Sequence, residues 1–298
     1  MPHSPTQPAR ALIVGCGDIG ARILPLLAPH LNVIAVIRQV GRCTELRSAG
    51  AIPLIANLDE PHTLARLAKL ASYIVYLVPP PAEGTRDTRS RHLAAVLSHR
   101  CRLVYVSTSG VYGDCGGALI DETRMVNPHT LRAVRRVDAE QVWRNWAIRT
   151  GSCLSILRVP GIYASDRLPL ERIKKGIPAL LPEEDVYTNH IHADDLARLV
   201  VKALFHGSSN RVYHAVDDSC LSMGEYFDLV ADQFGLPQVP RLRRSELKSE
   251  VSEMALSFMS ESRRMRNCRV KQELGFKLLY PTVSDGLLIG NDIAIQNP

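Results

Sequence analysis

The chain has 298 residues, a formal net charge of +6 at pH 7 and an apolar fraction of 46%. This length accommodates one α/β domain and a smaller lobe, and the composition is that of a soluble globular protein. No apolar run approaches the roughly 20 residues of a membrane helix, so we expect no membrane partner. The basic residues are spread along the chain, matched by 30 acids and without a nucleic-acid-binding signature. We therefore expect anionic small molecules, not nucleic acid, as partners of the excess charge.

The N-terminal ten residues are rich in proline and lack the apolar core of a signal peptide, so we expect no export. Seven cysteines are scattered along the chain, an odd number without a CxxC pair. This usage is typical of free thiols in a reducing compartment, and we expect a cytoplasmic protein.

In chain order, short apolar runs alternate with amphipathic segments. We expect strands at residues 11–14, 31–37, 51–55, 73–78, 103–106 and 154–157. We expect helices at residues 19–28, 62–70, 89–99 and 131–148. This βαβ alternation predicts an α/β fold in which a doubly wound parallel sheet is covered on both faces.

The regular alternation ends near residue 165, and proline-bounded pieces with a charged stretch follow. We therefore assign residues 1–165 to a nucleotide-binding sheet domain, with a returning segment at about 186–222. Residues 166–185 and 223–298 are assigned to a smaller C-terminal substrate lobe. Ligands of open α/β sheets bind at the carboxyl edge of the strands, which the lobe would cover.

A hexapeptide with the sequence GCGDIG lies between the first expected strand and the first expected helix. This context is what a dinucleotide-binding fingerprint requires. Gly15 permits the tight turn, Gly17 lets the backbone approach a diphosphate, and Gly20 lets the helix pack closely against the strand. Asp18 and Ile19 begin the helix, where unpaired amides and the positive dipole end favour an anion. The alternative is an ordinary glycine turn.

The second expected strand ends in Arg38, 18 residues after Gly20. NAD-preferring sites place an acid there for the ribose 2′-hydroxyl. A guanidinium instead favours a 2′-phosphate, and Arg42 adds positive charge. We therefore expect NADP as the cofactor, with NAD as the alternative. The competing interpretation places both arginines in a solvated loop.

Further motifs follow the glycine turn in a characteristic order. They are NLD at 57–59, VYVSTSGVYG at 104–113, LRVPGIY at 157–163, IHADDLA at 191–197, SRR at 262–264 and ELGF at 273–276. Together they resemble the extended and atypical short-chain dehydrogenases/reductases of the NAD-dependent epimerase/dehydratase family. The resemblance spans nearly the whole chain. It implies a Rossmann fold with a small C-terminal substrate lobe, bound NAD(P), and hydride transfer on a carbonyl or alcohol; many relatives act on nucleotide sugars.

The same resemblance implies further cofactor-binding residues. Asn57 and Leu58 match the segment in which the family contacts adenine. Leu77, Val78 and Pro79 follow the fourth expected strand and match the segment that lines the cofactor's ribose and nicotinamide.

The catalytic region departs from the family pattern. The resemblance implies that Thr108, four residues before the tyrosine of the VYG motif, holds the substrate oxygen. The usual catalytic tyrosine and lysine are missing: counted back from Glu140, their positions hold Arg132 and Arg136. Arginine does not release its proton near neutral pH, but two guanidiniums on one helix face can bind an anion or stabilise an oxyanion. The alternative is a solvated basic helix.

The group that replaces the missing acid stays open. His129 lies just before the expected helix, and an imidazole titrates near neutrality. Tyr112 and Tyr163 are the phenolic candidates. Each of the three has a purely structural alternative, as a turn histidine or a packed tyrosine.

Two histidines and two aspartates cluster at His190, His192, Asp194 and Asp195. We expect no metal there, because no further set of ligands converges on them. Asp194 or Asp195 is expected to cap the helix that follows.

These observations predict an NADP(H)-dependent oxidoreductase or epimerase that acts on an anionic small molecule, with nucleotide sugars among the candidates. The alternatives are a catalytically silent NADP(H)-binding redox sensor and a structural Rossmann domain without a nucleotide. A homodimer is expected by analogy with relatives that pair through helices flanking the sheet.

Overall fold

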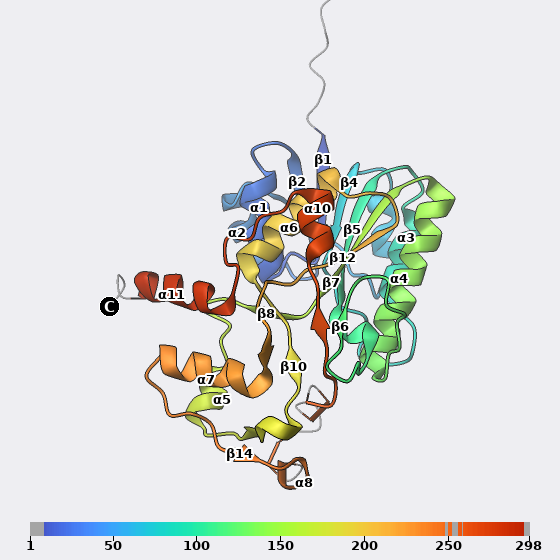
Figure 1. Cartoon of the computed structure of the whole chain (residues 1–298). Coiled ribbons are helices and arrows are strands. Elements are labelled where there is room, and N and C mark those ends of the chain that lie inside the picture. The colour runs from blue at the N-terminus through green and yellow to red at the C-terminus, as the bar shows by residue number, and fades with distance from the viewer. Residues whose placement is uncertain (1–8, 248–249, 252–255, 258, 295–298) are drawn as a thin grey trace, which may run out of the picture.

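A parallel sheet of seven strands forms the centre of the molecule (Figure 1). The computed structural model describes residues 9–247, 250–251, 256–257 and 259–294. The strand order is β12-β7-β5-β4-β1-β2-β3, with every neighbouring pair parallel. The strands are β1 (Arg10–Val14), β2 (Asn32–Ile37), β3 (Ile52–Ile55), β4 (Tyr73–Tyr76), β5 (Arg102–Thr108), β7 (Cys153–Val159) and β12 (Arg211–His214). The doubly wound fold expected from the sequence is confirmed.

Helices cover both faces of this sheet. They are α1 (Asp18–Leu27), α2 (Cys43–Ser48), α3 (Thr88–Val96), α4 (Leu131–Thr150), α6 (Ala193–His206) and α10 (Cys268–Leu274). Successive residues of β1 face opposite sides: Ile13 packs in the cluster that contains α1 and α6, and Leu12 in the cluster that contains α3 and α4. Because both faces are buried, the strands need continuous apolar runs, which is the pattern in the sequence. No helix among the described residues is long and apolar enough to span a membrane.

The helix expected at 62–70 is instead the 3₁₀ helix η2 (Pro61–Leu67). Its two fully buried side chains, Leu64 and Leu67, are three residues apart. That spacing puts both on one face of a helix with three residues per turn.

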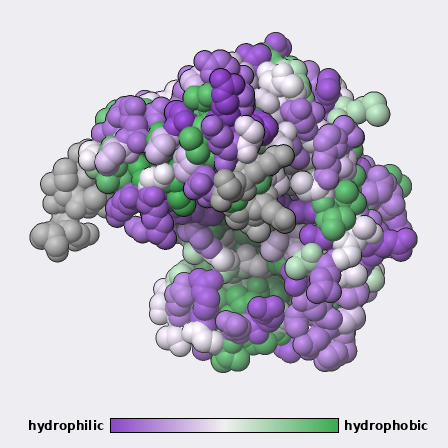
Figure 2. Space-filling view, turned by 90° about the horizontal axis from the view of Figure 1, so that it is seen from below, coloured by the Kyte–Doolittle hydropathy of each residue, from purple (hydrophilic) through white to green (hydrophobic). Residues whose placement is uncertain are grey.

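A smaller lobe lies beyond the carboxyl edge of the sheet, at the bottom of Figure 1. Its elements are α5 (Leu170–Lys174), β9 (Ala179–Leu180), α7 (Met223–Gln233), β14 (Arg241–Leu242), α8 (Arg244–Leu247) and α11 (Val283–Ala294). It has its own core, in which Ile173, Phe227 and Val230 pack together. Seen from the lobe end, the surface is hollowed, and both hydrophilic and hydrophobic side chains border the hollow (Figure 2).

The remaining elements are short and lie in the segments between those already named. They are β6 (Leu119–Ile120), β8 (Gly161–Tyr163), β10 (Tyr187–Thr188), β11 (His190–His192), β13 (Leu221–Ser222), β15 (Arg264–Met265) and the 3₁₀ helices η1 (Val40–Arg42), η3 (Ser109–Tyr112) and η4 (Pro182–Glu184).

Helix α10 packs with the sheet domain and not with the lobe, which corrects the boundary drawn at 223–298. Val270 and Leu274, one helical turn apart, join the core beside α6. Phe276 follows them into the same cluster. The sequence does not predict this packing, because α10 has only seven residues and three of them are charged.

Candidate functional site

The carboxyl ends of the strands around β1 border a cavity of about 490 Å³. Three loops that follow β1, β3 and β4, together with the end of β2, supply its walls. Of the residues expected to bind a cofactor, these line it: Gly15, Gly17, Arg38, Arg42, Asn57, Leu58, Leu77, Val78 and Pro79. Asp18, Ile19 and Gly20 line an adjoining cavity of about 380 Å³. The fold therefore brings all of them to one edge of the sheet.

The glycine turn has the geometry that a diphosphate needs. Gly15 has φ +87°, and a Cβ on it would lie 2.6 Å from Cγ2 of Val78. A Cβ on Gly17 would meet nothing within 4 Å, so backbone there is open to an approaching ligand. Gly17 is the N-cap of α1, and no side chain caps the amides of the first turn. Open backbone and uncapped amides at a helix N-terminus fit the diphosphate of a dinucleotide.

Charged side chains also border the first cavity. Arg38 is exposed at its edge. Arg42 pairs with Glu45 at 2.6 and 3.0 Å. Arg89 donates two hydrogen bonds of 2.7 Å to Asp59 and so holds the pKa of that carboxyl below its ordinary value. Sequence reasoning missed Arg89, because its partner lies 30 residues away. Three arginines and one aspartate line the cavity, which suits a phosphate.

Arg136, on helix α4, lies in the adjoining cavity. Its Nη1 donates to the hydroxyl of Tyr105 at 3.0 Å and to the carbonyl of Val106 at 2.9 Å. These two bonds hold the guanidinium against the end of β5, beside Thr108. A fixed positive charge therefore faces the space next to the glycine turn.

A further cavity of about 320 Å³ lies between the sheet edge and the lobe, and Arg132 lines it. Arg263 also lines it, with Nη1 bonded to Glu261 at 2.8 Å and to the carbonyl of Gly113 at 2.6 Å. The buried Nε of Arg263 has no hydrogen-bond partner among the described residues. The sequence marked the SRR motif only as part of the family resemblance. Its contact with the site is not predicted, because Arg263 and Gly113 are 150 positions apart in the sequence.

The remaining candidates for a proton donor lie elsewhere. The exposed ring of His129 is 2.9 Å from Nδ2 of Asn127 and lines neither of these two cavities. Tyr163 is buried, and its hydroxyl donates to the carbonyl of Thr282 at 3.1 Å. Neither group reaches the space beside Thr108.

A buried polar network lies behind β5. The hydroxyl of Ser107 donates to Glu140 at 2.8 Å, and Arg158 binds the same carboxylate at 2.8 and 3.1 Å. Arg158 also donates to the hydroxyl of Tyr112 at 2.7 Å, which in turn contacts Nε2 of His214 at 2.6 Å. Burial lowers the pKa of His214 to about 3 and raises the pKa of Tyr112 to about 12. Both groups are neutral at physiological pH, and Tyr112 is committed to this network.

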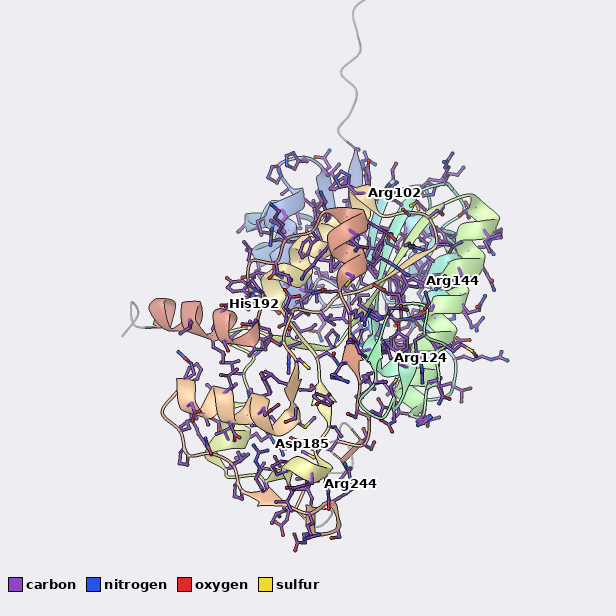
Figure 3. All side chains as sticks on the ribbon, viewed as in Figure 1. Arg102, Arg124, Arg144, Asp185, His192 and Arg244 are labelled. Atoms are coloured by element: carbon purple, nitrogen blue, oxygen red, sulfur yellow. The ribbon has the colours of Figure 1, made fainter. Side chains whose placement is uncertain are left out.

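The His190–Asp195 segment is structural. His192, labelled in Figure 3, is the N-cap of α6: its Nδ1 accepts a hydrogen bond from the amide of Asp194 at 3.2 Å. The expectation of an aspartate cap is wrong. Asp195 instead accepts hydrogen bonds from the amides of Leu279 and of the next residue, which fixes the chain before α11. Among the described residues, no three metal-ligating side chains gather into a site.

Known proteins match this chain over almost its whole length. An uncharacterized protein from Schizosaccharomyces pombe is 22% identical over 306 residues, covering 93% of this chain and 98% of that protein. A functionally unknown conserved protein from Silicibacter pomeroyi has a TM-score of 0.78 at 28% identity, covering 96% of this chain and 99% of the other.

Two solved enzymes have the same fold at lower identity. UDP-glucose 4-epimerase from Thermotoga maritima has a TM-score of 0.76 at 17% identity, covering 96% of this chain and 99% of its own. A dTDP-glucose 4,6-dehydratase from Streptomyces venezuelae, solved with NAD, has a TM-score of 0.77 at 18% identity, covering 97% of both chains.

The model of the NAD dependent epimerase/dehydratase family matches residues 11–216. This match runs from β1 through β12 and includes the glycine turn, the end of β5 and helix α4. Since it covers well over half of the chain, the protein belongs to the NAD-dependent epimerase/dehydratase family.

Proposed function

We propose that the protein is an NADP(H)-dependent oxidoreductase or epimerase that acts on a carbonyl or alcohol of an anionic small molecule. The observation that supports this proposal most directly is that two neighbouring cavities have lining residues in common. Thr108 and Pro160 line both the cavity beside the glycine turn and the cavity that contains Arg132 and Arg263. A cofactor and a substrate bound in these two cavities would meet at Thr108.

The bound cofactor would supply or accept the hydride. The amides at the start of α1 would bind its diphosphate, and Arg38 would bind a 2′-phosphate. NAD remains the alternative cofactor, since the solved dehydratase of this fold was crystallised with NAD.

Thr108 is suited to hold a substrate oxygen. Its Oγ1 accepts a hydrogen bond from the amide of Gly110 at 3.3 Å, which leaves the hydroxyl proton for donation. Arg132 and Arg263 would bind the substrate's anionic group, and Arg136 would stabilise negative charge on the reacting oxygen. Because arginine keeps its proton, transfer of the reacting proton is left to water, to the substrate itself or to the phenol of Tyr187, which lines the same cavity as Arg132 and Arg263. His129 takes no part in this arrangement.

A panel assay tests the proposal. NADPH and NADH oxidation would be followed with keto acids, phosphorylated ketones and nucleotide sugars, and we expect turnover with at least one class. Thr108→Val should lower kcat at least tenfold and leave the dissociation constant of NADPH unchanged. Thr108→Ser, which keeps the hydroxyl, is the matched control and should retain most of the activity. Absence of turnover across the panel would contradict the proposal.

One observation favours a second function, a catalytically silent NADP(H) sensor. The positions of the usual tyrosine and lysine hold arginines, and the hydroxyls of Tyr112 and Tyr163 are engaged elsewhere. Calorimetry separates the two functions. Tight binding that differs between NADPH and NADP⁺, without turnover, supports the sensor.

A further inference from the structure

Two ion pairs join the loop after β8 to the first turns of α1. Arg167 of this loop binds Asp18, with Nη1 2.7 Å from Oδ2. Its neighbour Asp166 accepts a bond of 3.3 Å from Arg22, one turn further along α1. Arg22 also binds the other carboxylate oxygen of Asp18 at 3.0 Å. Two adjacent loop residues, one acidic and one basic, are therefore each paired with an oppositely charged residue of the helix.

The two arginines of this cluster differ in what surrounds them. Arg22 has three acidic partners, because Asp194 binds it at 2.6 Å in addition to Asp18 and Asp166. Within the part of the chain that the structure describes, the guanidinium of Arg167 is bonded to Asp18 alone. Losing this one bond would leave the loop attached to α1 through Arg22.

Arg167 also lines the cavity beside the glycine turn, together with Gly15, Gly17 and Asp18. The cavity contains the open backbone that fits a diphosphate. The carboxylate of Asp18 therefore places a negative charge where the diphosphate, itself an anion, would bind. The pair is partly exposed, with 36% of the Arg167 side chain and 39% of the Asp18 side chain accessible. An ion pair as exposed as this contributes little free energy and is easily exchanged.

We propose that Arg167 is a cofactor-binding residue that exchanges Asp18 for the diphosphate when the dinucleotide binds; this rests on the proposed function. A guanidinium binds phosphate oxygens through two parallel, charge-assisted hydrogen bonds. Its present partner Asp18 accepts one bond from Arg167, is exposed and is shared with Arg22, so we expect the diphosphate to bind Arg167 more strongly. The exchange moves one side chain, while Asp166 and Arg22 keep the loop in place. Because the loop runs directly into α5, this contact ties the substrate lobe to the bound cofactor.

Calorimetric titration with two probes tests the proposal. ADP-ribose 2′-phosphate contains the diphosphate, and 2′-AMP contains only the adenosine end. We expect Arg167→Ala to weaken binding of the first probe about tenfold and to leave binding of the second within twofold. Asp18→Asn should act in the opposite direction and tighten the first probe several-fold, since it removes a like charge and leaves Arg167 only a neutral, weaker acceptor.

Arg22→Ala is the matched control. Arg22 also binds the carboxylate of Asp18, but it does not line the cavity. We expect Arg22→Ala to weaken binding of the first probe by less than a third of the fold-change measured for Arg167→Ala. Thermal melts establish that each variant is folded, and Arg167→Lys, which keeps the charge without the planar fork, should fall between wild type and alanine.

Equal losses in the Arg167 and Arg22 variants, or an Arg167→Ala variant that binds both probes like wild type, would overturn the inference and leave the proposed function standing. Failure of the wild-type protein to bind ADP-ribose 2′-phosphate and ADP-ribose would overturn both.

Discussion

Replacing Gly17 by alanine should separate cofactor binding from folding. The added Cβ has nothing within 4 Å, and the φ of −85° is accessible to alanine. A loss of about 0.5–1 kcal/mol at an N-cap is offset by a gain of about 0.4–1 kcal/mol from the less flexible unfolded chain. We therefore expect the free energy of unfolding to change by less than about 1 kcal/mol.

Binding should respond far more strongly. The methyl group of Gly17→Ala would occupy the space through which the diphosphate reaches the first-turn amides of α1. Each charge-assisted hydrogen bond contributes about 1.5–3 kcal/mol, so losing two costs about 3–6 kcal/mol. At 1.4 kcal/mol for each factor of ten, NADPH should bind more than about a hundredfold more weakly.

Fluorescence titration with NADPH and urea denaturation measure the two quantities on the same protein. Gly15→Ala is the comparison, since its φ is +87° and its Cβ would clash with Val78 at 2.6 Å. We expect that variant to lose at least about 1–3 kcal/mol of stability from backbone strain alone. A Gly17→Ala protein that bound NADPH like wild type, or that unfolded as readily as Gly15→Ala, would refute this reasoning.

Three further predictions follow from charged groups. Arg38→Asp should weaken NADP⁺ at least tenfold and NAD⁺ much less, measured by titration; equal losses would remove the argument for a 2′-phosphate. Glu140→Gln should lower the free energy of unfolding by about 3 kcal/mol, because it leaves buried Arg158 without a full countercharge. Urea denaturation should show much of this loss recovered when Arg158→Met is added to Glu140→Gln. A loss below about 1 kcal/mol for Glu140→Gln alone would contradict a large stabilising role for the Arg158–Glu140 pair. Burial raises the pKa of Asp217 from 3.8 to about 7, so the folded protein retains a proton that the unfolded chain releases. Stability should therefore fall as pH rises from about 4 through 7, and Asp217→Asn should flatten that slope in denaturation curves.

Local patterns predict the centre of this fold well. Strands buried on both faces require continuous apolar runs, and the six expected strands correspond to β1, β2, β3, β4, β5 and β7. The glycine turn is equally readable, because its conformation is set by the turn itself. Strand β12 is not predicted: it is short, lies at the sheet edge, and contains the charged Arg211 and the buried polar His214.

The parts of the site that the sequence does not predict are those that depend on distant contacts. Arg167 and Asp18 are 149 positions apart, and no local pattern relates them. The cap of α6 is missed for a different reason. Histidine is not among the usual N-cap residues, and His192 takes that role because β11 ends with its ring beside the first amides of the helix.

The two arginines on α4 change what the site can do. A tyrosine and lysine in these positions would exchange a proton with the substrate, whereas the guanidinium of an arginine is too weak an acid for that role. Among the described residues that line the cavities on either side of Thr108, there is no histidine, lysine or cysteine. Hydrogen bonds to Tyr105 and Val106 fix the guanidinium of Arg136 in position. Under the proposed function, such a site would act on a substrate by electrostatic stabilisation and orientation, with the hydroxyl of Thr108 at the boundary between the two cavities.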